Sequence, residues 1–153
     1  MRMELLIHGQ PVTKKNSMRL VQVHGRMIPI PSKQYKEYEH LCLAQIPGWQ
    51  KCRIDYPVNV ACVYWMATKR PVDLLNLLGA TMDILVDAGV LKDDNARIVV
   101  SHDGSRVEYD KNDPRVEITI TEGKVHGAET DGRDQPRGTE ADEGGGPDQQ
   151  TNR

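Results

Sequence analysis

Several motifs that mark large enzyme classes are missing from this sequence of 153 residues. There is no G-x-x-x-x-G-K-[ST] loop to cradle nucleotide phosphates and no G-x-S-x-G turn around a nucleophilic serine. Cysteine and histidine lack zinc-site spacing, and the three cysteines form no C-x-x-C pair. These absences argue against a P-loop hydrolase, a serine hydrolase of that type and a zinc-bound fold. Because Cys42, Cys52 and Cys62 are odd in number and lie in segments that otherwise have core composition, we predict reduced, buried thiols.

The sequence also lacks a long apolar run. No window approaches the roughly 18 apolar residues that a membrane span needs, and the opening MRMELLIHGQ has no long apolar stretch. We therefore expect a cytoplasmic protein with no membrane partner. The length fits one domain of ordinary size with one hydrophobic core.

An excess of basic residues, which nucleic-acid-binding proteins usually show, is missing as well, since the net charge is -2. This total hides a difference between two parts of the chain. Residues 123–153 hold seven acids, four bases and seven of the 13 glycines, with almost no apolar residue beyond Val125. Removing them from the totals of 22 acids and 20 bases leaves 15 acids and 16 bases in residues 1–122. We predict a nearly neutral domain over 1–122 and a disordered, acidic, glycine-rich tail over 123–153, which cannot bury enough surface to offset the entropy of ordering.

Two helices are expected from the spacing of apolar residues. The first covers 33–46, with Ser32 as its N-cap and Pro47-Gly48 as its end. The second is amphipathic, begins after the N-cap Asp73 and ends at Gly89, which suits the residue that follows a helix.

Alternating or apolar runs between turn residues predict the strands. His24-Gly25 has the composition of a hairpin turn, and Asp103-Gly104 marks a second turn. Together with the two helices, the strands predict an α+β domain without internal repeats. They cover 3–8, 20–23, 27–30, 57–67, 98–101, 105–109 and 115–121, with 57–67 as the central strand.

The placement of three carboxylates indicates a site. Asp73 is expected at a strand-to-helix junction, and the adjacent Asp93 and Asp94 follow the same helix in a short loop. Neighbouring carboxylates repel each other unless a cation or a raised pKa relieves the repulsion, and oxygen ligands suit magnesium or manganese. The alternative is structural: an aspartate N-cap stabilises a helix by ~1 kcal/mol without any catalytic role. Spacing alone leaves both interpretations open.

Basic residues flank these positions. Lys14, Lys15 and Asn16 form a polar loop with Ser17 and Arg19, while Lys69 and Arg70 precede Asp73. They suit phosphate contacts and equally suit simple solvation. Asp103, within His102-Asp103-Gly104, has the composition of a turn and is also a candidate to swing toward a nearby metal site.

The stretch RPVDLLNLLGATMDILVDAGVLKDDN, residues 70–95, resembles the RusA-like endodeoxyribonucleases, which are often prophage-encoded. Their pattern is close to D-L-D-N, a helix, and then G-x-x-x-D-D. The opening GQPVTKKNSMR and the later DGSRVEYDKNDPRVEITI are also similar to the family, so the resemblance covers about residues 3–121. The residues in register with the central pattern are Asp73, Leu74, Asn76, Asp83, Gly89, Asp93 and Asp94.

The resemblance implies a homodimer with a mixed sheet flanked by helices. Such a protein binds four-way (Holliday) DNA junctions in recombination and repair and nicks two strands with magnesium, one strand per subunit. Carried over to this chain, Asp73, Asp93 and Asp94 are metal ligands or orient the attacking water, and Asn76 supports them.

Two positions depart from the family pattern. Leu75 stands where a second aspartate is expected, and Gly79 stands where the family has a lysine that assists cleavage. Either another acid substitutes, with Asp103 favoured over Asp110, or activity is reduced. The alternatives are a junction-binding protein that has lost catalysis and a scaffold whose acids only cap helices and turns.

Overall fold

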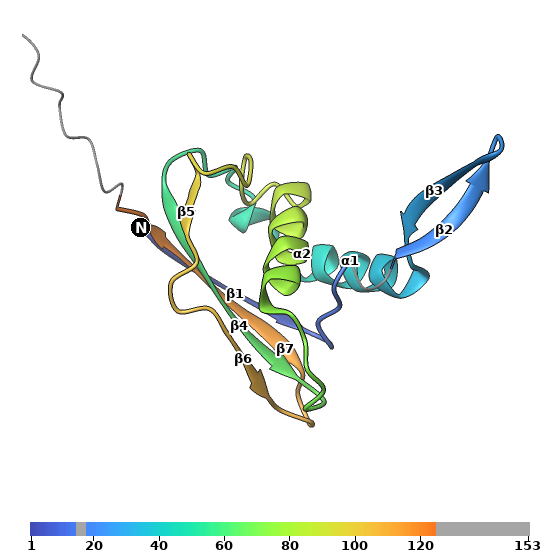
Figure 1. Cartoon of the computed structure of the whole chain (residues 1–153). Coiled ribbons are helices and arrows are strands. Elements are labelled where there is room, and N and C mark those ends of the chain that lie inside the picture. Colours follow the sequence, from blue (N-terminus) through green and yellow to red (C-terminus); the bar gives the residue numbers. More distant parts are fainter. Residues whose placement is uncertain (15–17, 125–153) are drawn as a thin grey trace, which may run out of the picture.

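The computed structural model describes residues 1–14 and 18–124. Five strands form one mixed sheet: β1 (Arg2–His8), β4 (Val58–Met66), β5 (Val99–Ser101), β6 (Arg106–Tyr109) and β7 (Arg115–Glu122) (Figure 1). The antiparallel strands run in the order β1-β7-β4, and β5 and β6 follow each other along the free edge of β4, both parallel to it. The predicted α+β class with a mixed sheet is confirmed.

One face of the sheet forms the core. In β4 the side chains alternate between buried and half-buried positions, as the period of two in its sequence predicts. Both α1 (Lys33–Gln45) and α2 (Leu74–Asp87) contribute buried side chains to the same apolar cluster, and they lie on one side of the sheet (Figure 1). The helices therefore cover one face and leave the other open. The fully buried centre includes Ile7, Val58, Val60, Tyr64, Leu77, Leu85, Ile118 and Ile120.

The predicted helix boundaries are confirmed by their capping interactions. Ser32 Oγ accepts a hydrogen bond from the Tyr35 N–H at 3.1 Å, and a 3₁₀ turn, η2 (Gly48–Gln50), follows α1. The Asp73 carboxylate accepts from the Leu75 N–H at 2.9 Å, so it caps α2. At the other end Gly89 has φ +77°, a conformation that glycine adopts without steric cost.

A hairpin formed by β2 (Met18–Val23) and β3 (Arg26–Pro31) projects away from the sheet and from α2 (Figure 1). His24 and Gly25 connect the strands, with φ of +47° and +77°, as a tight two-residue turn requires. The predicted hairpin is confirmed. Because it stands clear of the core, large apolar side chains such as Leu20 and Met27 remain exposed.

The predicted strands on either side of Asp103-Gly104 are present as β5 and β6, and both pair with β4. The prediction of three buried thiols is correct for Cys42 and Cys62 and wrong for Cys52, which is exposed because it lies in the loop between η2 and β4.

Among the described residues, no helix has both the length and the apolar character to cross a membrane. Most of the predicted tail, residues 125–153, lies outside the described part of the chain.

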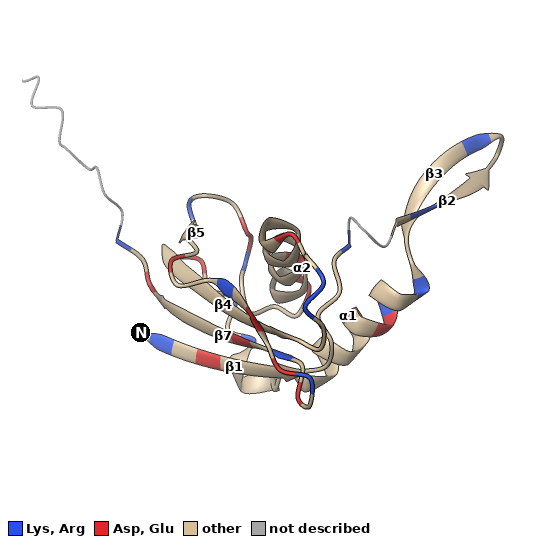
Figure 2. Ribbon diagram, turned by 60° about the horizontal axis from the view of Figure 1, so that its bottom comes forward, with Lys and Arg blue, Asp and Glu red and all other residues tan. Residues whose placement is uncertain are grey.

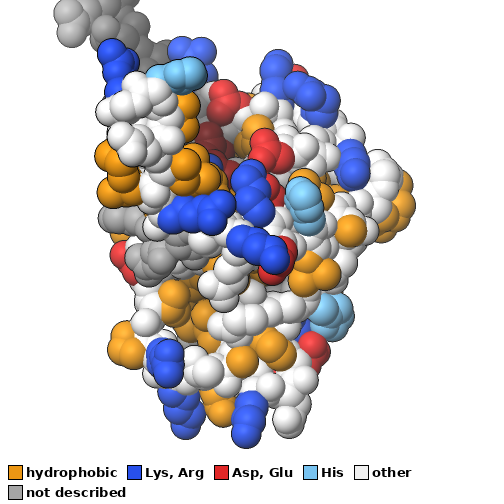
Figure 3. Space-filling model, turned by 90° about the vertical axis from the view of Figure 1, so that its right-hand side faces the viewer, with side chains coloured by type: hydrophobic (Ala, Val, Ile, Leu, Met, Phe, Trp, Pro, Cys, Tyr) orange, Lys and Arg blue, Asp and Glu red, His pale blue; other side chains and the backbone are white. Residues whose placement is uncertain are grey.

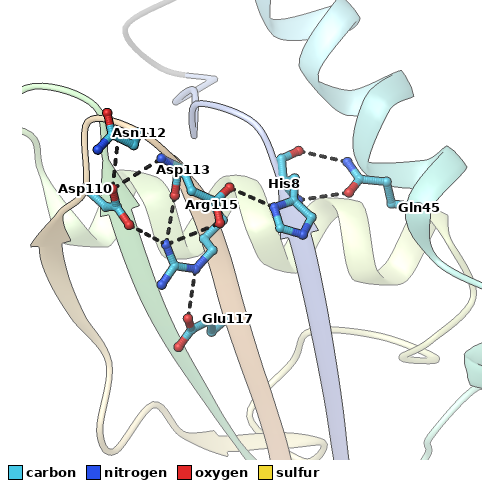
Figure 4. A network of polar contacts seen from close by, with 7 residues as sticks. All are labelled: His8, Gln45, Asp110, Asn112, Asp113, Arg115 and Glu117. Carbon is cyan, nitrogen blue, oxygen red and sulfur yellow. Dashed lines mark hydrogen bonds and ion pairs between the residues drawn. The ribbon is translucent and has the colours of Figure 1, made fainter.

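A polar network fixes the start of β7 (Figure 4). Arg115 pairs with Asp110 at 2.9 Å and with Glu117 at 2.9 Å, and its guanidinium lies 4.5 Å from the centre of the Trp65 ring. Asp113 in turn accepts from His8 at 2.9 Å, which links the β6–β7 loop to the end of β1. The network joins three strands at one end of the sheet.

Candidate active site

A hollow of about 400 Å³ lies against the outer face of α2. The helix supplies residues three and four positions apart, namely Leu75, Asn76, Gly79, Ala80 and Asp83, so they share one face. The opposite face of α2 carries apolar side chains into the core. The other walls of the hollow are Lys14 before the hairpin, Met18 at its start, and Asp94 in the loop after α2.

Charges of both signs meet in this hollow. The Lys14 ammonium lies 3.2 Å from the Asp83 carboxylate, and both side chains are a little under half exposed. An ion pair with this exposure contributes little to folding because water screens it. It does hold the end of the Lys14 side chain against α2. On the face that carries the hairpin, acidic side chains lie beside lysine and arginine side chains and apolar ones (Figure 3).

The loop after α2 positions Asp94. Backbone hydrogen bonds from Ile54 to Val90 and from Lys92 to Ile54, each 2.9 Å, tie the start of the loop to the segment before β4. The Asp93 carboxylate then accepts from the Asp94 N–H at 2.7 Å and from the Asn95 amide at 2.8 Å. The Asn95 bond is the main cause that lowers the pKa of Asp93, followed by the Asp94 N–H. Asp93 therefore remains ionised and shapes the loop, while Asp94 faces the hollow.

The other predicted site residues lie elsewhere. Asp73 is exposed at the N-terminus of α2 and does not line the hollow. Asp103 occupies the turn between β5 and β6, where its N–H donates to the Asn59 side chain at 2.7 Å, and it lines a different hollow with Glu122 and Lys124. The Lys69 ammonium stands 5.2 Å from the centre of the Tyr109 ring, and Arg70 is exposed nearby in sequence. Lys15 and Asn16 lie outside the described residues.

The hollow contains the donors that a hard cation prefers. Among residues 1–14 and 18–124, no three His, Cys, Asp or Glu side chains lie close enough together to hold a metal ion. The hollow instead combines the Asp83 and Asp94 carboxylates with the Asn76 amide. Magnesium often binds through one or two carboxylates and fills its other positions with water and substrate phosphate. This donor set fits such an ion.

Asp83 was absent from the site residues selected from the sequence. The signal for it is present in the helical spacing, because Asn76, Gly79, Ala80 and Asp83 recur at intervals of three and four on a helix whose other face is apolar. An acidic residue on this polar face of the helix is a candidate for the same site as Asp94, which lies in the loop that follows the helix.

A protein-family model described as "Endodeoxyribonuclease RusA" matches residues 8–121, which is 114 of the 153 residues. The match includes all the residues that line the hollow. No curated protein is detectably similar to the chain in sequence.

Proposed function

Because the chain belongs to the endodeoxyribonuclease RusA family, we propose that it resolves four-way DNA junctions by paired nicks that depend on magnesium or manganese. The observation that carries this proposal is the convergence of Asp94, Asn76 and Asp83 with one lysine in a single hollow. Carboxylates and an amide suit a hard cation, and the ammonium suits a phosphate.

We assign the metal-binding role first to Asp94, which faces the hollow from a fixed loop. Asp83 shares the hollow with Asp94 and is the second proposed ligand, with Asn76 in support. Asp73 and Asp93, predicted from the sequence, stay candidates for the same group from outside this hollow. A bound ion would polarise the scissile phosphate and lower the pKa of an attacking water. The role of Asp103 as a substitute acid is weaker, because its turn lies by another hollow.

We assign phosphate binding to Lys14, together with Lys15, Asn16, Lys69 and Arg70. Lys14 is the one cation among the described residues that line the hollow, and a Cβ built on Gly79 would meet nothing within 4 Å apart from its own helix backbone and chain neighbours. Lys14 and Gly79 line the same hollow, so the Lys14 ammonium and a helical lysine at position 79 would open into one shared space. A lysine delivered from the N-terminal loop would thus substitute for the missing one.

The proposed unit of function is a homodimer. A four-way junction has two strands to cut in symmetrical positions, and a twofold dimer presents two identical sites. Each subunit would then nick one strand.

The test is cleavage of a synthetic four-way junction by the full chain with magnesium, comparing Asp94→Asn with Asp103→Asn. Asp94→Asn is expected to lower the cleavage rate by roughly 100-fold or more, since even indirect partners of a metal cost 10- to 100-fold. Asp103→Asn changes the weaker candidate in the same way and should retain most activity, because its turn lies by another hollow. Equal losses in both variants would contradict the assignment to Asp94. Tight junction binding without cleavage by the unmodified chain under any divalent cation would contradict the nuclease itself.

A second candidate function is junction binding without catalysis, which two positions in the hollow favour. Leu75 is 75% exposed there and cannot bind a metal, and Gly79 supplies no ammonium. If catalysis has been lost, the double variant Leu75→Asp/Gly79→Lys should gain cleavage where the unmodified chain has none. The open surroundings of both positions make these changes compatible with the fold.

A further inference from the structure

A second hollow, of about 420 Å³, lies on the other side of the Asp93-Asp94 loop. Three cations from two separate segments meet there: Arg53 comes from the loop before β4, and Lys92 and Arg97 come from the loop after α2. Basic and acidic residues are interspersed on the loops around α2 (Figure 2). Asp55, Asp93, Asn95 and Ile98 complete the lining.

The two segments are held together by the backbone. The Arg53 N–H donates to the Gly89 carbonyl at 2.9 Å, next to the hydrogen bonds that join Ile54 to Val90 and Lys92 to Ile54. Arg53 adopts φ +50°, an unfavourable conformation for a residue with a side chain, and such residues concentrate at binding sites. The cations therefore occupy defined positions relative to one another.

The two acids of this hollow already have partners. Asp55 lies 3.6 Å from the Lys92 ammonium, and the Asp93 carboxylate accepts the hydrogen bonds that shape its own loop. By contrast, the guanidinium groups of Arg53 and Arg97 form no ion pair with any residue that the structure describes. A free guanidinium presents a planar set of donors that matches two oxygens of a phosphate.

The position of this hollow relates it to the active site. Asp93 lines it and the adjacent Asp94 lines the hollow against α2, so the two hollows share one wall. A DNA strand that places one phosphate beside Asp94 and crosses this shared wall meets Arg53 and Arg97 on its other side.

We propose that Arg53 and Arg97, assisted by Lys92, bind a phosphodiester group of the DNA next to the one that is cut. The site takes any DNA sequence, because it contacts the backbone and no base. It directs one arm of the junction past the Asp93-Asp94 loop. This inference rests on the proposed function for its substrate, and it concerns binding rather than cleavage.

The experiment measures how the affinity of the full chain for a fluorescent four-way junction depends on salt, with calcium in place of magnesium to prevent turnover. Each lost phosphate contact lowers the slope of log affinity against log salt by about 1. Arg53→Gln/Arg97→Gln is expected to lower the slope by about 2 and to weaken binding most at low salt. Thermal unfolding confirms that the variant is folded.

The control is Arg2→Gln/Arg106→Gln, which removes the same charge from two exposed arginines that already pair with Glu4 and Glu108. It should leave the slope unchanged. Equal slopes for the two variants, or no change in either, would overturn the phosphate site, as would the absence of DNA binding by the unmodified chain. This test is independent of cleavage. A chain that binds junctions without cutting them would contradict the nuclease proposal, but its affinity would still depend on salt and the slope could still be measured.

Discussion

At the scale of single residues, the ion pair between Lys14 and Asp83 is the contact that most affects the proposed chemistry. Asp83 lies on α2 and holds the ammonium 3.2 Å away, within the same hollow as Asp94. Because the pair is half exposed, its contribution to folding is at most ~1 kcal/mol. A role in catalysis should therefore be separable from a role in stability.

We expect Lys14→Met to lower the rate of junction cleavage by about 10- to 100-fold while the free energy of unfolding falls by less than ~1 kcal/mol. The reason is loss of the Lys14 ammonium, which lines the hollow beside Asp83. Gly79→Lys in the Lys14→Met background should restore part of the rate, since position 79 opens into the same space. Cleavage kinetics and urea unfolding measure the two effects. An unchanged cleavage rate in Lys14→Met would remove this lysine from the mechanism.

The residue scale also shows where prediction from sequence ended. Asp73 as an N-cap follows from local chain chemistry and was predictable, as was the turn at His24-Gly25. That Asp94 faces the hollow while Asp93 faces away depends on hydrogen bonds within a folded loop, which composition does not specify. The exposure of Cys52 likewise depends on a loop that leaves the core.

At the scale of elements, α2 is joined to the sheet by a buried polar contact as well as by apolar packing. The Tyr64 hydroxyl on β4 and Thr81 Oγ1 on α2 are 2.7 Å apart, and both side chains are buried. Thr81 Oγ1 also donates to the Leu77 carbonyl at 3.0 Å, so Tyr64 donates to Thr81. This contact fixes the helix that forms one wall of the candidate active-site hollow.

Thr81→Val is expected to destabilise the fold by about 1–3 kcal/mol, because it leaves the buried Tyr64 hydroxyl without an acceptor. Tyr64→Phe/Thr81→Val should cost less than the sum of the two single changes, since no unsatisfied hydroxyl remains. Denaturant unfolding of the four proteins gives the coupling energy. Strict additivity would show that the hydroxyls do not interact.

The elements themselves were largely predictable, because the periods of 2 and 3.6 are local properties of the sequence. The pairing partner of each strand was harder to predict. Strands β5 and β6 both pair with β4 after the chain crosses over through α2, and an alternating pattern does not encode which neighbour a strand selects. The local pattern of apolar residues also does not determine the direction in which the β2–β3 hairpin projects.

For the whole molecule, the Arg115 network makes stability depend on pH. The hydrogen bond from Arg115 is the main cause that lowers the pKa of Asp110, followed by backbone N–H groups of Asn112 and Asp113. A carboxyl group whose pKa is lower in the folded state stabilises the protein above its unfolded pKa, and the stabilisation is lost as the pH falls through the folded value.

Arg115→Met should therefore lower the melting temperature at neutral pH, and the difference from the unmodified chain should shrink as the pH falls below about 4, the ordinary range for aspartate. Melting curves at several pH values measure this. The cation–π contact with Trp65 is lost at every pH, so a residual difference at low pH is expected. A difference that grows on acidification would contradict the sign derived from Asp110.

The different roles of Asp93 and Asp94 depend on the number of residues in their loop. Successive side chains face different hollows, while the hydrogen bonds of Lys92 and Asn95 fix the segment on either side. One residue inserted before Asp93 would move Asp93 into the position of Asp94, facing the hollow against α2, and would leave the hydrogen bonds that shape the loop without their carboxylate. The length of this loop therefore determines which carboxylate faces the hollow. An insertion or deletion is expected to disturb this arrangement more than a single substitution in the same loop.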